Sequence, residues 1–255
     1  MDWREERTAF SGHISMNDVL LVLQHVPFEH AGRFADVAQS NGIEIEVLKL
    51  WENYRIPNLK KYTRLLIMGG PQSVYEPVDR YPSLNFETET IKAFARMHKP
   101  VLGVCLGCQL IAHAFGGEAY QNKVCDRPFK ETGFYKVSLT PQGESSPLFK
   151  GFPVSFEVFQ WHGDIFNLPN EAVLLATSQN VQNQAFSCGD TTFALLFHIE
   201  VTPQMVQELV KTDSEWLHRD NDVDERIIIE QAYKNEQNLK KLSEIMFNNW
   251  LKIPV

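Results

Sequence analysis

One short segment of the sequence places a cysteine between two glycines, and it reads Gly103-Val104-Cys105-Leu106-Gly107-Cys108-Gln109. An apolar run typical of a strand precedes it and a helical pattern follows it. A thiol on so sharp a turn is exposed at the carboxyl edge of a sheet, and flanking glycines permit a strained backbone. The N–H groups that begin the helix favour thiolate over thiol and can stabilise an oxyanion. The segment therefore predicts a nucleophile at Cys105, although a buried cysteine at a helix cap would fit it as well.

A second segment, Phe197-His198-Ile199-Glu200, follows a strongly apolar run in the second half of the chain. In a strand, residues two apart point the same way, so His198 and Glu200 are expected to emerge together at the end of that strand. A histidine that contacts Cys105 while a carboxylate orients it supplies a nucleophile, a base and an orienting group. This pairing favours the catalytic interpretation of Cys105.

Other chemistry is less well supported by the cysteines and histidines. Cys105 and Cys108 have the spacing of a redox pair, but the glycines around them suit a nucleophile turn better. His162, in Trp161-His162-Gly163-Asp164, is expected at the rim of the site or in a structural turn. The histidines are too scattered for a zinc site, so no metal and no cofactor is expected.

Apolar runs and helical patterns alternate through the first half of the chain and predict an α/β fold. Strands are expected at 19–23, 44–50, 64–68 and 100–104, and helices at 31–41, 84–97 and 106–115. Such alternation implies a twisted, mainly parallel sheet with helices on both faces, a flavodoxin-like arrangement with the nucleophile elbow at its carboxyl edge. Residues 134–197 look β-rich and are expected to extend the same sheet.

The remainder of the chain is expected to belong to the same domain. Residues 203–252 form an amphipathic helical extension, with core contacts expected from Ile227, Ile228, Ala232, Leu239, Leu242 and Ile245. Residues 1–17 mix charges of both signs and predict a disordered leader without a secretory signal. We therefore expect one domain over residues 18–255.

Composition limits the classes of partner. The net charge is -8, which argues against a nucleic-acid partner because phosphate binding rests on lysine and arginine. No apolar run is long enough to span a bilayer, so no membrane partner is expected. Four cysteines in a chain of this length, with no signal segment, predict reduced thiols in the cytoplasm.

These motifs together resemble the class I glutamine amidotransferase family, in particular the amidotransferase domains of guanylate synthases. Gly103, Cys105, Gly107 and Gln109 match the family motif G-x-C-x-G-x-Q, and Phe197, His198 and Glu200 match F-H-P-E. The turn Gly69-Gly70-Pro71 and the segment 161–164, similar to S-H-G-D, are further matches in the same order. The resemblance covers about residues 18–202, and its main departure is Ile199, where the family usually has proline.

The resemblance implies a catalytic triad of Cys105, His198 and Glu200 acting through a γ-glutamyl thioester. It implies an oxyanion hole from the backbone N–H groups of Gly70 and Leu106. It also implies a substrate pocket shaped by Gln109, with main-chain contacts from Gly133 and Phe134. Lys123, Arg127 and Lys130 could meet an acidic group of the substrate or simply be solvated.

Three functions agree with this resemblance. The chain could hydrolyse glutamine and deliver ammonia to a separate synthetase chain. It could instead be a stand-alone hydrolase of γ-glutamyl peptides. The stretch after the triad is too short for a nucleotide-activating domain, which favours either self-sufficient hydrolysis or a loosely held partner. A non-catalytic regulatory module is the third, and the intact triad argues against it.

Overall fold

The computed structural model describes residues 18–219 and 223–255, so the leader expected at residues 1–17 lies outside the described residues. The first half contains the expected alternation of strands and helices. Its elements are β1 (Val19–Gln24), α1 (Gly32–Ser40), β2 (Glu44–Lys49), a 3-10 turn (Leu59–Lys61), β3 (Arg64–Ile67), α2 (Leu84–Arg96), β4 (Val101–Val104) and α3 (Leu106–Ala114). Each expected strand and helix of this half lies within a few residues of its predicted bounds.

The second half adds strands to the same sheet, as expected. Its elements are β5 (Ala119–Gln121), β6 (Lys123–Val124), β7 (Arg127–Pro128), β8 (Glu131–Leu139), α4 (Pro141–Ser145), a 3-10 turn (Pro147–Phe149), β9 (Ser155–His162), β10 (Asp164–Phe166), β11 (Val173–Ser178), β12 (Ala185–Cys188) and β13 (Thr192–Leu195). The small strands β5, β6, β7 and β10 form two-stranded ribbons outside the main sheet.

The main sheet has nine strands in the order β2-β1-β3-β4-β13-β12-β11-β8-β9. The strands from β2 to β13 pair in parallel, and each later pair is antiparallel. Only β12 and β8 therefore run against the direction of β1, and the sheet is mainly parallel. Because β13 pairs directly with β4, the ends of these two strands lie side by side at the carboxyl edge.

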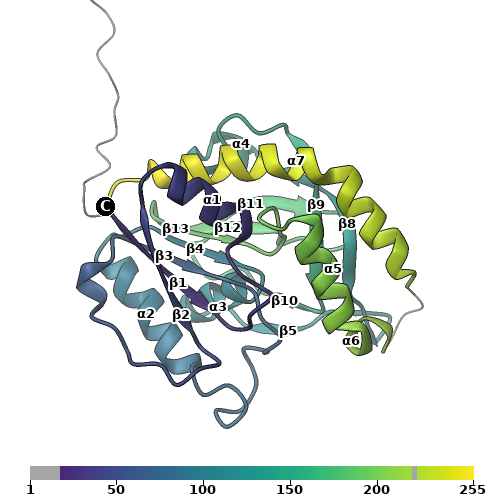
Figure 1. Cartoon of the computed structure of the whole chain (residues 1–255), viewed down its shortest axis with the longest axis horizontal. Helices are drawn as coiled ribbons and strands as arrows, with labels where there is room; N and C mark the ends of the chain where they lie inside the picture. Colours follow the sequence, from purple (N-terminus) through teal and green to yellow (C-terminus); the bar gives the residue numbers. More distant parts are fainter. Residues whose placement is uncertain (1–17, 220–222) are drawn as a thin grey trace, which may run out of the picture.

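Helices cover both faces of the sheet, and the strands divide their side chains between them (Figure 1). Leu20 and Val22 of β1 join one core cluster with α1 and the C-terminal helix, whereas Leu21 and Leu23 join a second cluster with α2 and α3. This alternation follows from the period of two along a strand. A sheet buried on both faces explains the apolar runs of the inner strands β1, β3 and β4.

The C-terminal part is helical, as expected, and consists of α5 (Pro203–Thr212), α6 (Ser214–His218) and α7 (Glu225–Leu251). Four of the expected core contacts are buried, namely Ile228, Ala232, Leu239 and Leu242. The expectation for Ile227 is wrong, because its side chain is 54% exposed on the outer side of α7. Ile245 is partly buried.

Candidate active site

Cys105 lies in the turn that joins β4 to α3. Its backbone has φ 52° and ψ -106°, a strained conformation for a residue with a side chain, and its N–H donates to the Leu195 carbonyl at 2.8 Å. A Cβ atom at Gly103 would lie 2.4 Å from the Gly107 carbonyl oxygen, and one at Gly107 would lie 2.3 Å from the Ile67 carbonyl oxygen. Both glycines are therefore required by the close approach of backbone segments around the elbow.

His198 and Glu200 follow β13, the strand next to the elbow. Nδ1 of His198 lies 2.7 Å from Oε1 of Glu200, and the N–H of Ile199 donates to Oε2 of Glu200 at 3.1 Å. Since an ionised carboxylate only accepts hydrogen bonds, Nδ1 carries a proton in this arrangement. Ile199 thus contributes a backbone donor that a proline at this position would lack.

The backbone of His198 is also held in place. Its N–H donates to the Phe159 carbonyl at 2.8 Å, and its own carbonyl accepts from the Phe159 N–H at 3.2 Å, so His198 bridges to β9. The carbonyl of Glu200 accepts from the N–H of Arg33 at the start of α1 at 2.9 Å. Nε2 of His198 is buried and has no hydrogen-bond partner within the described part of the chain.

The thiol and the imidazole influence each other's charge. Burial raises the pKa of Cys105, and the positive charge of the neighbouring His198 opposes this rise. Burial lowers the pKa of His198, but the Glu200 carboxylate and the Cys105 sulfur outweigh it, so this pKa stands well above its ordinary value. His198 therefore readily holds the proton that the Cys105 thiol releases when it becomes a thiolate.

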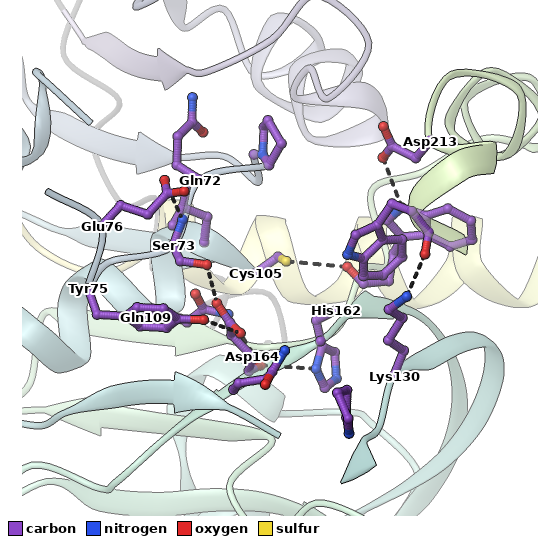
Figure 2. Close-up of a pocket in the computed structure, with 18 of the residues that line it drawn as sticks. Gln72, Ser73, Tyr75, Glu76, Cys105, Gln109, Lys130, His162, Asp164 and Asp213 are labelled. Atoms are coloured by element: carbon purple, nitrogen blue, oxygen red, sulfur yellow. Dashed lines mark hydrogen bonds between the residues drawn. The ribbon is translucent and has the colours of Figure 1, made fainter. Parts of the chain in front are cut away.

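A cavity of about 330 Å³ opens onto Cys105. Gly70, Leu106 and Gln109 line it, so the structure brings four of the expected site residues together in one cavity. Figure 2 shows the Cys105 thiol between a group formed by Ser73, Tyr75 and Asp164 and a second group that includes Lys130 and Asp213. His198 and Glu200 are almost fully buried beside the elbow rather than in the cavity wall.

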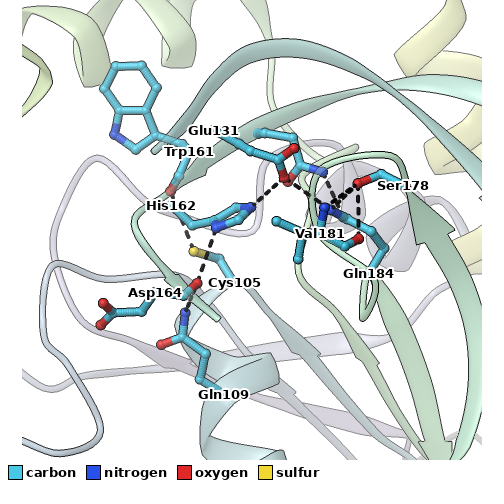
Figure 3. Close-up of polar contacts among 10 residues, drawn as sticks. Cys105, Gln109, Glu131, Trp161, His162, Asp164, Ser178, Val181 and Gln184 are labelled. Carbon is cyan, nitrogen blue, oxygen red and sulfur yellow. Dashed lines mark hydrogen bonds and ion pairs between the residues drawn. The ribbon is translucent and has the colours of Figure 1, made fainter. Parts of the chain in front are cut away.

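Residues 161–164 form another wall of the cavity, as expected of a rim segment. The Trp161 carbonyl lies 3.7 Å from the Cys105 sulfur, and Gln109 Nε2 donates to the Asp164 carbonyl at 3.4 Å. His162 is held at both ring nitrogens, by the Asp164 carbonyl at 3.1 Å and by Glu131 Oε2 at 3.1 Å (Figure 3). His162 therefore fixes this wall and has no ring nitrogen left for a substrate.

Some of the expected residues lie elsewhere. Gly133 and Phe134 belong to the β8–β9 ladder, opposite Gln160 and Phe159, and neither lines the cavity. Of the three basic residues left open, Lys130 lines the cavity, whereas Lys123 and Arg127 are exposed on the β6–β7 ribbon.

The two cysteines of the C-x-x-C spacing pack in different places. Cys105 belongs to the core cluster with α1 and α7, and Cys108 belongs to the one with α2 and is fully buried. Both thiols are free. Burial raises the pKa of Cys108 well above its ordinary value, which keeps it a thiol. This arrangement argues against a redox pair.

Several cavity residues were not expected from the sequence. Glu29 follows β1 and Asp213 follows α5, and both carboxyl groups line the cavity with Glu76 and Asp164. The signal that could have found Glu29 is its place after a parallel strand, where the loops at the carboxyl edge of a sheet meet. Asp213 offered no such signal, because it follows a helix rather than a parallel strand.

Residues 18–219 and 223–255 contain neither a cluster of metal-binding side chains nor a membrane-spanning helix. No group of three or more histidine, cysteine, aspartate or glutamate side chains is arranged to hold a metal ion. None of the helices in that part of the chain is long and apolar enough to cross a membrane.

The known proteins to which this chain is similar are glutamine amidotransferases and glutamine-hydrolysing synthases. The family model of glutamine amidotransferase class-I matches residues 33–213, a range that includes Cys105, His198 and Glu200. The glutamine amidotransferase-like protein YfeJ of Salmonella typhimurium is 30% identical over 190 residues, which cover 73% of this chain and 77% of YfeJ. The glutamine-hydrolysing GMP synthase of Thermosipho melanesiensis is 28% identical over 62% of this chain, but the match spans only 30% of that synthase.

A solved structure agrees over nearly the whole chain. A glutamine amidotransferase of Thermotoga maritima superposes with a TM-score of 0.81 at 30% identity, covering 92% of this chain and 98% of that one. The similarity therefore includes the C-terminal helices as well as the matched family range.

Proposed function

The chain belongs to the class-I glutamine amidotransferase family, and from this premise we propose that it hydrolyses γ-glutamyl amides with Cys105 as nucleophile. The observation that carries the proposal is the strained elbow at Cys105, which opens onto a cavity and adjoins a histidine bound to a buried glutamate. A thiol, a base and an orienting carboxylate in this order are the parts that acyl transfer requires.

In the first half-reaction, the proton of the Cys105 thiol moves to Nε2 of His198, and the thiolate attacks the amide carbon. Gly70 and Leu106 line the cavity together with Cys105, and their backbone N–H groups would bind the oxyanion. His198 then gives its proton to the departing nitrogen. The C–N bond breaks, the amine leaves, and the γ-glutamyl group remains on Cys105 as a thioester.

In the second half-reaction, a water molecule gives a proton to His198 and attacks the thioester carbon. Collapse of the intermediate breaks the C–S bond, releases the γ-carboxylate and returns the proton to the sulfur. Glu200 holds His198 in one tautomer throughout, because its two oxygens accept from Nδ1 and from the Ile199 N–H. Gln109 would orient the glutamyl part of the substrate from the first turn of α3.

Glutamine is the family's substrate, and its hydrolysis would yield glutamate and ammonia. Two fates of the ammonia fit the relatives: release by a stand-alone hydrolase, or delivery to a separate synthetase chain, since GMP synthases contain a matching segment. The first fate needs no partner. The second predicts low activity that rises when the synthetase is added.

The test is amide release by the purified chain from glutamine and from glutathione. Cys105→Ala should abolish turnover, and Glu200→Gln should lower kcat/KM on the order of a hundredfold or more, because the imidazole loses its orienting charge. Mass spectrometry should detect a γ-glutamyl adduct on Cys105. Equal turnover by the wild type and Cys105→Ala would refute the proposal. Glutamine turnover that appears only with cell extract would indicate a synthetase partner.

A further inference from the structure

Glu29 is a cavity residue that the triad chemistry does not use. Its side chain lines the cavity, yet only 8% of the residue is exposed. It makes no hydrogen bond or ion pair with any other residue that the structure describes, which is unusual for a carboxylate so deeply buried. A buried carboxylate without a protein partner, facing a cavity, indicates a ligand that brings the missing positive charge.

The position of Glu29 relates it to the leaving group. Its carboxyl group packs against Gly69, and the ring of His198 approaches the same point. Since His198 protonates the departing nitrogen in the proposed reaction, Glu29 lies on the side of the cavity to which the amine leaves. Gln109, which would hold the glutamyl part, contacts the Asp164 carbonyl on another wall.

The other carboxylates of the cavity differ in how far the protein satisfies them. Asp164 accepts from the hydroxyl groups of Ser73 at 2.5 Å and Tyr75 at 3.0 Å, and Glu76 accepts from the Ser73 N–H at 3.2 Å. Asp213 accepts one bond, from Trp161 Nε1 at 3.2 Å, and its charge acts on Glu29. Of these four carboxylates, Glu29 is therefore the one that the described residues satisfy least, and it also experiences the charge of Asp213.

The basic residues of the cavity are engaged away from Glu29. Lys130 Nζ donates to the Trp216 carbonyl at 2.5 Å and lies 4.7 Å from the centre of the Trp216 ring. The Arg219 side chain is largely exposed, and its guanidinium lies 3.9 Å from Glu215. Within the described residues, neither side chain forms an ion pair with Glu29, so the negative potential at the leaving-group side is left for a ligand.

The size of the cavity permits a larger leaving group than ammonia. Its volume of about 330 Å³ lies at the lower end of the range for small-molecule sites, which is more than a glutamine side chain attached to Cys105 would fill. The cavity that Glu29 lines therefore has room for a leaving group larger than ammonia.

We propose that Glu29, with Asp213, forms a subsite for a cationic leaving group, and that the preferred substrates are γ-glutamyl amides of amines that carry a second, protonated amino group. This inference rests on the proposed hydrolysis of γ-glutamyl amides. The reaction is the one described above: water is consumed, His198 supplies the proton for the departing nitrogen, and the product is a diamine instead of ammonia.

The test compares two amides of the same length, γ-glutamyl diaminobutane and γ-glutamyl pentylamine, which differ in a terminal ammonium or methyl group. We expect the wild type to favour the ammonium-bearing amide on the order of tenfold to a hundredfold in kcat/KM. The matched variant Glu29→Gln should reduce this ratio nearly to one, and Glu29→Asp should retain part of it. Taking the ratio removes any effect of the variant on the chemical step itself.

The pH dependence of the ratio provides a second readout. Burial raises the pKa of Glu29 to about 7, with His198 and His25 opposing the rise and Asp213 and Glu200 adding to it. Glu29 is therefore charged above neutral pH and protonated below it, while the substrate ammonium stays charged across this range. The preference should be largest near pH 8 and decline toward pH 6 in the wild type, and it should be flat in Glu29→Gln.

Binding to the inactive Cys105→Ser variant separates this inference from the proposed function. Calorimetric preference for the ammonium-bearing amide, lost when Glu29→Gln is added, would support the subsite even if the wild type turned over neither amide. Equal binding and equal turnover of the two amides would overturn the inference, whether or not glutamine is hydrolysed. A Glu29→Gln variant that weakens both amides and glutamine alike would also overturn it, because Glu29 would then bind the glutamyl ammonium.

Discussion

The protonation of Cys105 depends on a few ionisable side chains around the elbow. Burial is the largest influence and raises the pKa of the thiol, and the carboxylates of Glu29 and Glu200 raise it further. His198 is the group that lowers it, through its positive charge. Nucleophilicity at neutral pH therefore requires His198 even before a substrate binds, because the thiolate is the reactive form.

This balance predicts opposite effects of two substitutions on the alkylation of Cys105. In His198→Ala the pH at which the alkylation rate is half-maximal should rise, because the imidazolium that stabilises the thiolate is gone. In Glu29→Gln it should fall, because a nearby negative charge is removed. The rate of iodoacetamide labelling, followed for the Cys105 peptide by mass spectrometry, measures both, with the exposed Cys125 as internal reference. Shifts of the same sign in the two variants would contradict this account.

Sequence reasoning found the residues of the proposed triad and missed the carboxylates that line the cavity. Cys105, His198 and Glu200 stand in short motifs whose spacing reflects the local backbone, so a linear pattern can reveal them. Glu29 and Asp213 come together only because the loop after β1 and the end of α5 meet at one edge of the sheet. No local pattern encodes such a meeting of distant segments.

At the scale of elements, the elbow depends on the close approach of the first turn of α3 to the end of β3. The carbonyl oxygen of Ile67, the last residue of β3, would lie 2.3 Å from a Cβ atom at Gly107. Since backbone atoms cannot yield as a flexible side chain can, α3 must shift to admit a methyl group. The displaced helix would move Cys105 and the Leu106 N–H relative to His198, which follows the end of β13.

Gly107→Ala is therefore expected to lower both stability and activity. The steric overlap should reduce the free energy of unfolding by about 1–3 kcal/mol, and the misplaced elbow should lower kcat/KM on the order of a hundredfold. Urea unfolding and γ-glutamyl amide hydrolysis measure the two effects. Gly189→Ala is the control, because Gly189 lies in an exposed turn with open space around it and only a left-handed φ of 62°. It should lose some stability and retain activity, and similar losses of activity in both variants would argue against a specific role of the elbow.

The order of the elements was predictable in the first half and less so in the second. Buried parallel strands leave continuous apolar runs, which mark β1, β3 and β4 in the sequence. The β-rich part has short strands whose partners are set by long-range pairing, such as β13 beside β4 and β11 beside β8. Ile227 was misplaced because the helical pattern of α7 contains an apolar residue on its exposed side as well.

For the molecule as a whole, α7 joins the two parts of the sheet. It packs on α1 above the parallel strands and also contacts α5, β8 and β9 at the antiparallel end (Figure 1). Phe247 of α7 stacks on Phe34 of α1 at 4.7 Å between ring centres, and the Leu251 carbonyl accepts from Arg64 of β3 at 2.7 Å. Because α1 in turn binds the Glu200 carbonyl, α7 supports the element that positions the proposed orienting carboxylate.

We therefore expect Trp250→Ala to destabilise the entire chain rather than release one helix. Trp250 is fully buried near the end of α7 and packs on Phe247 at 5.1 Å, so its removal leaves a large cavity and should lower the free energy of unfolding by about 3–5 kcal/mol. Ile227→Ala on the exposed side of the same helix should change it by no more than about 0.5 kcal/mol. Urea unfolding followed by both tryptophan fluorescence and far-ultraviolet circular dichroism should give one shared transition for Trp250→Ala. An early, separate loss of helical signal would instead show that α7 is a detachable extension. It would contradict the inference that α7 supports α1 and Glu200.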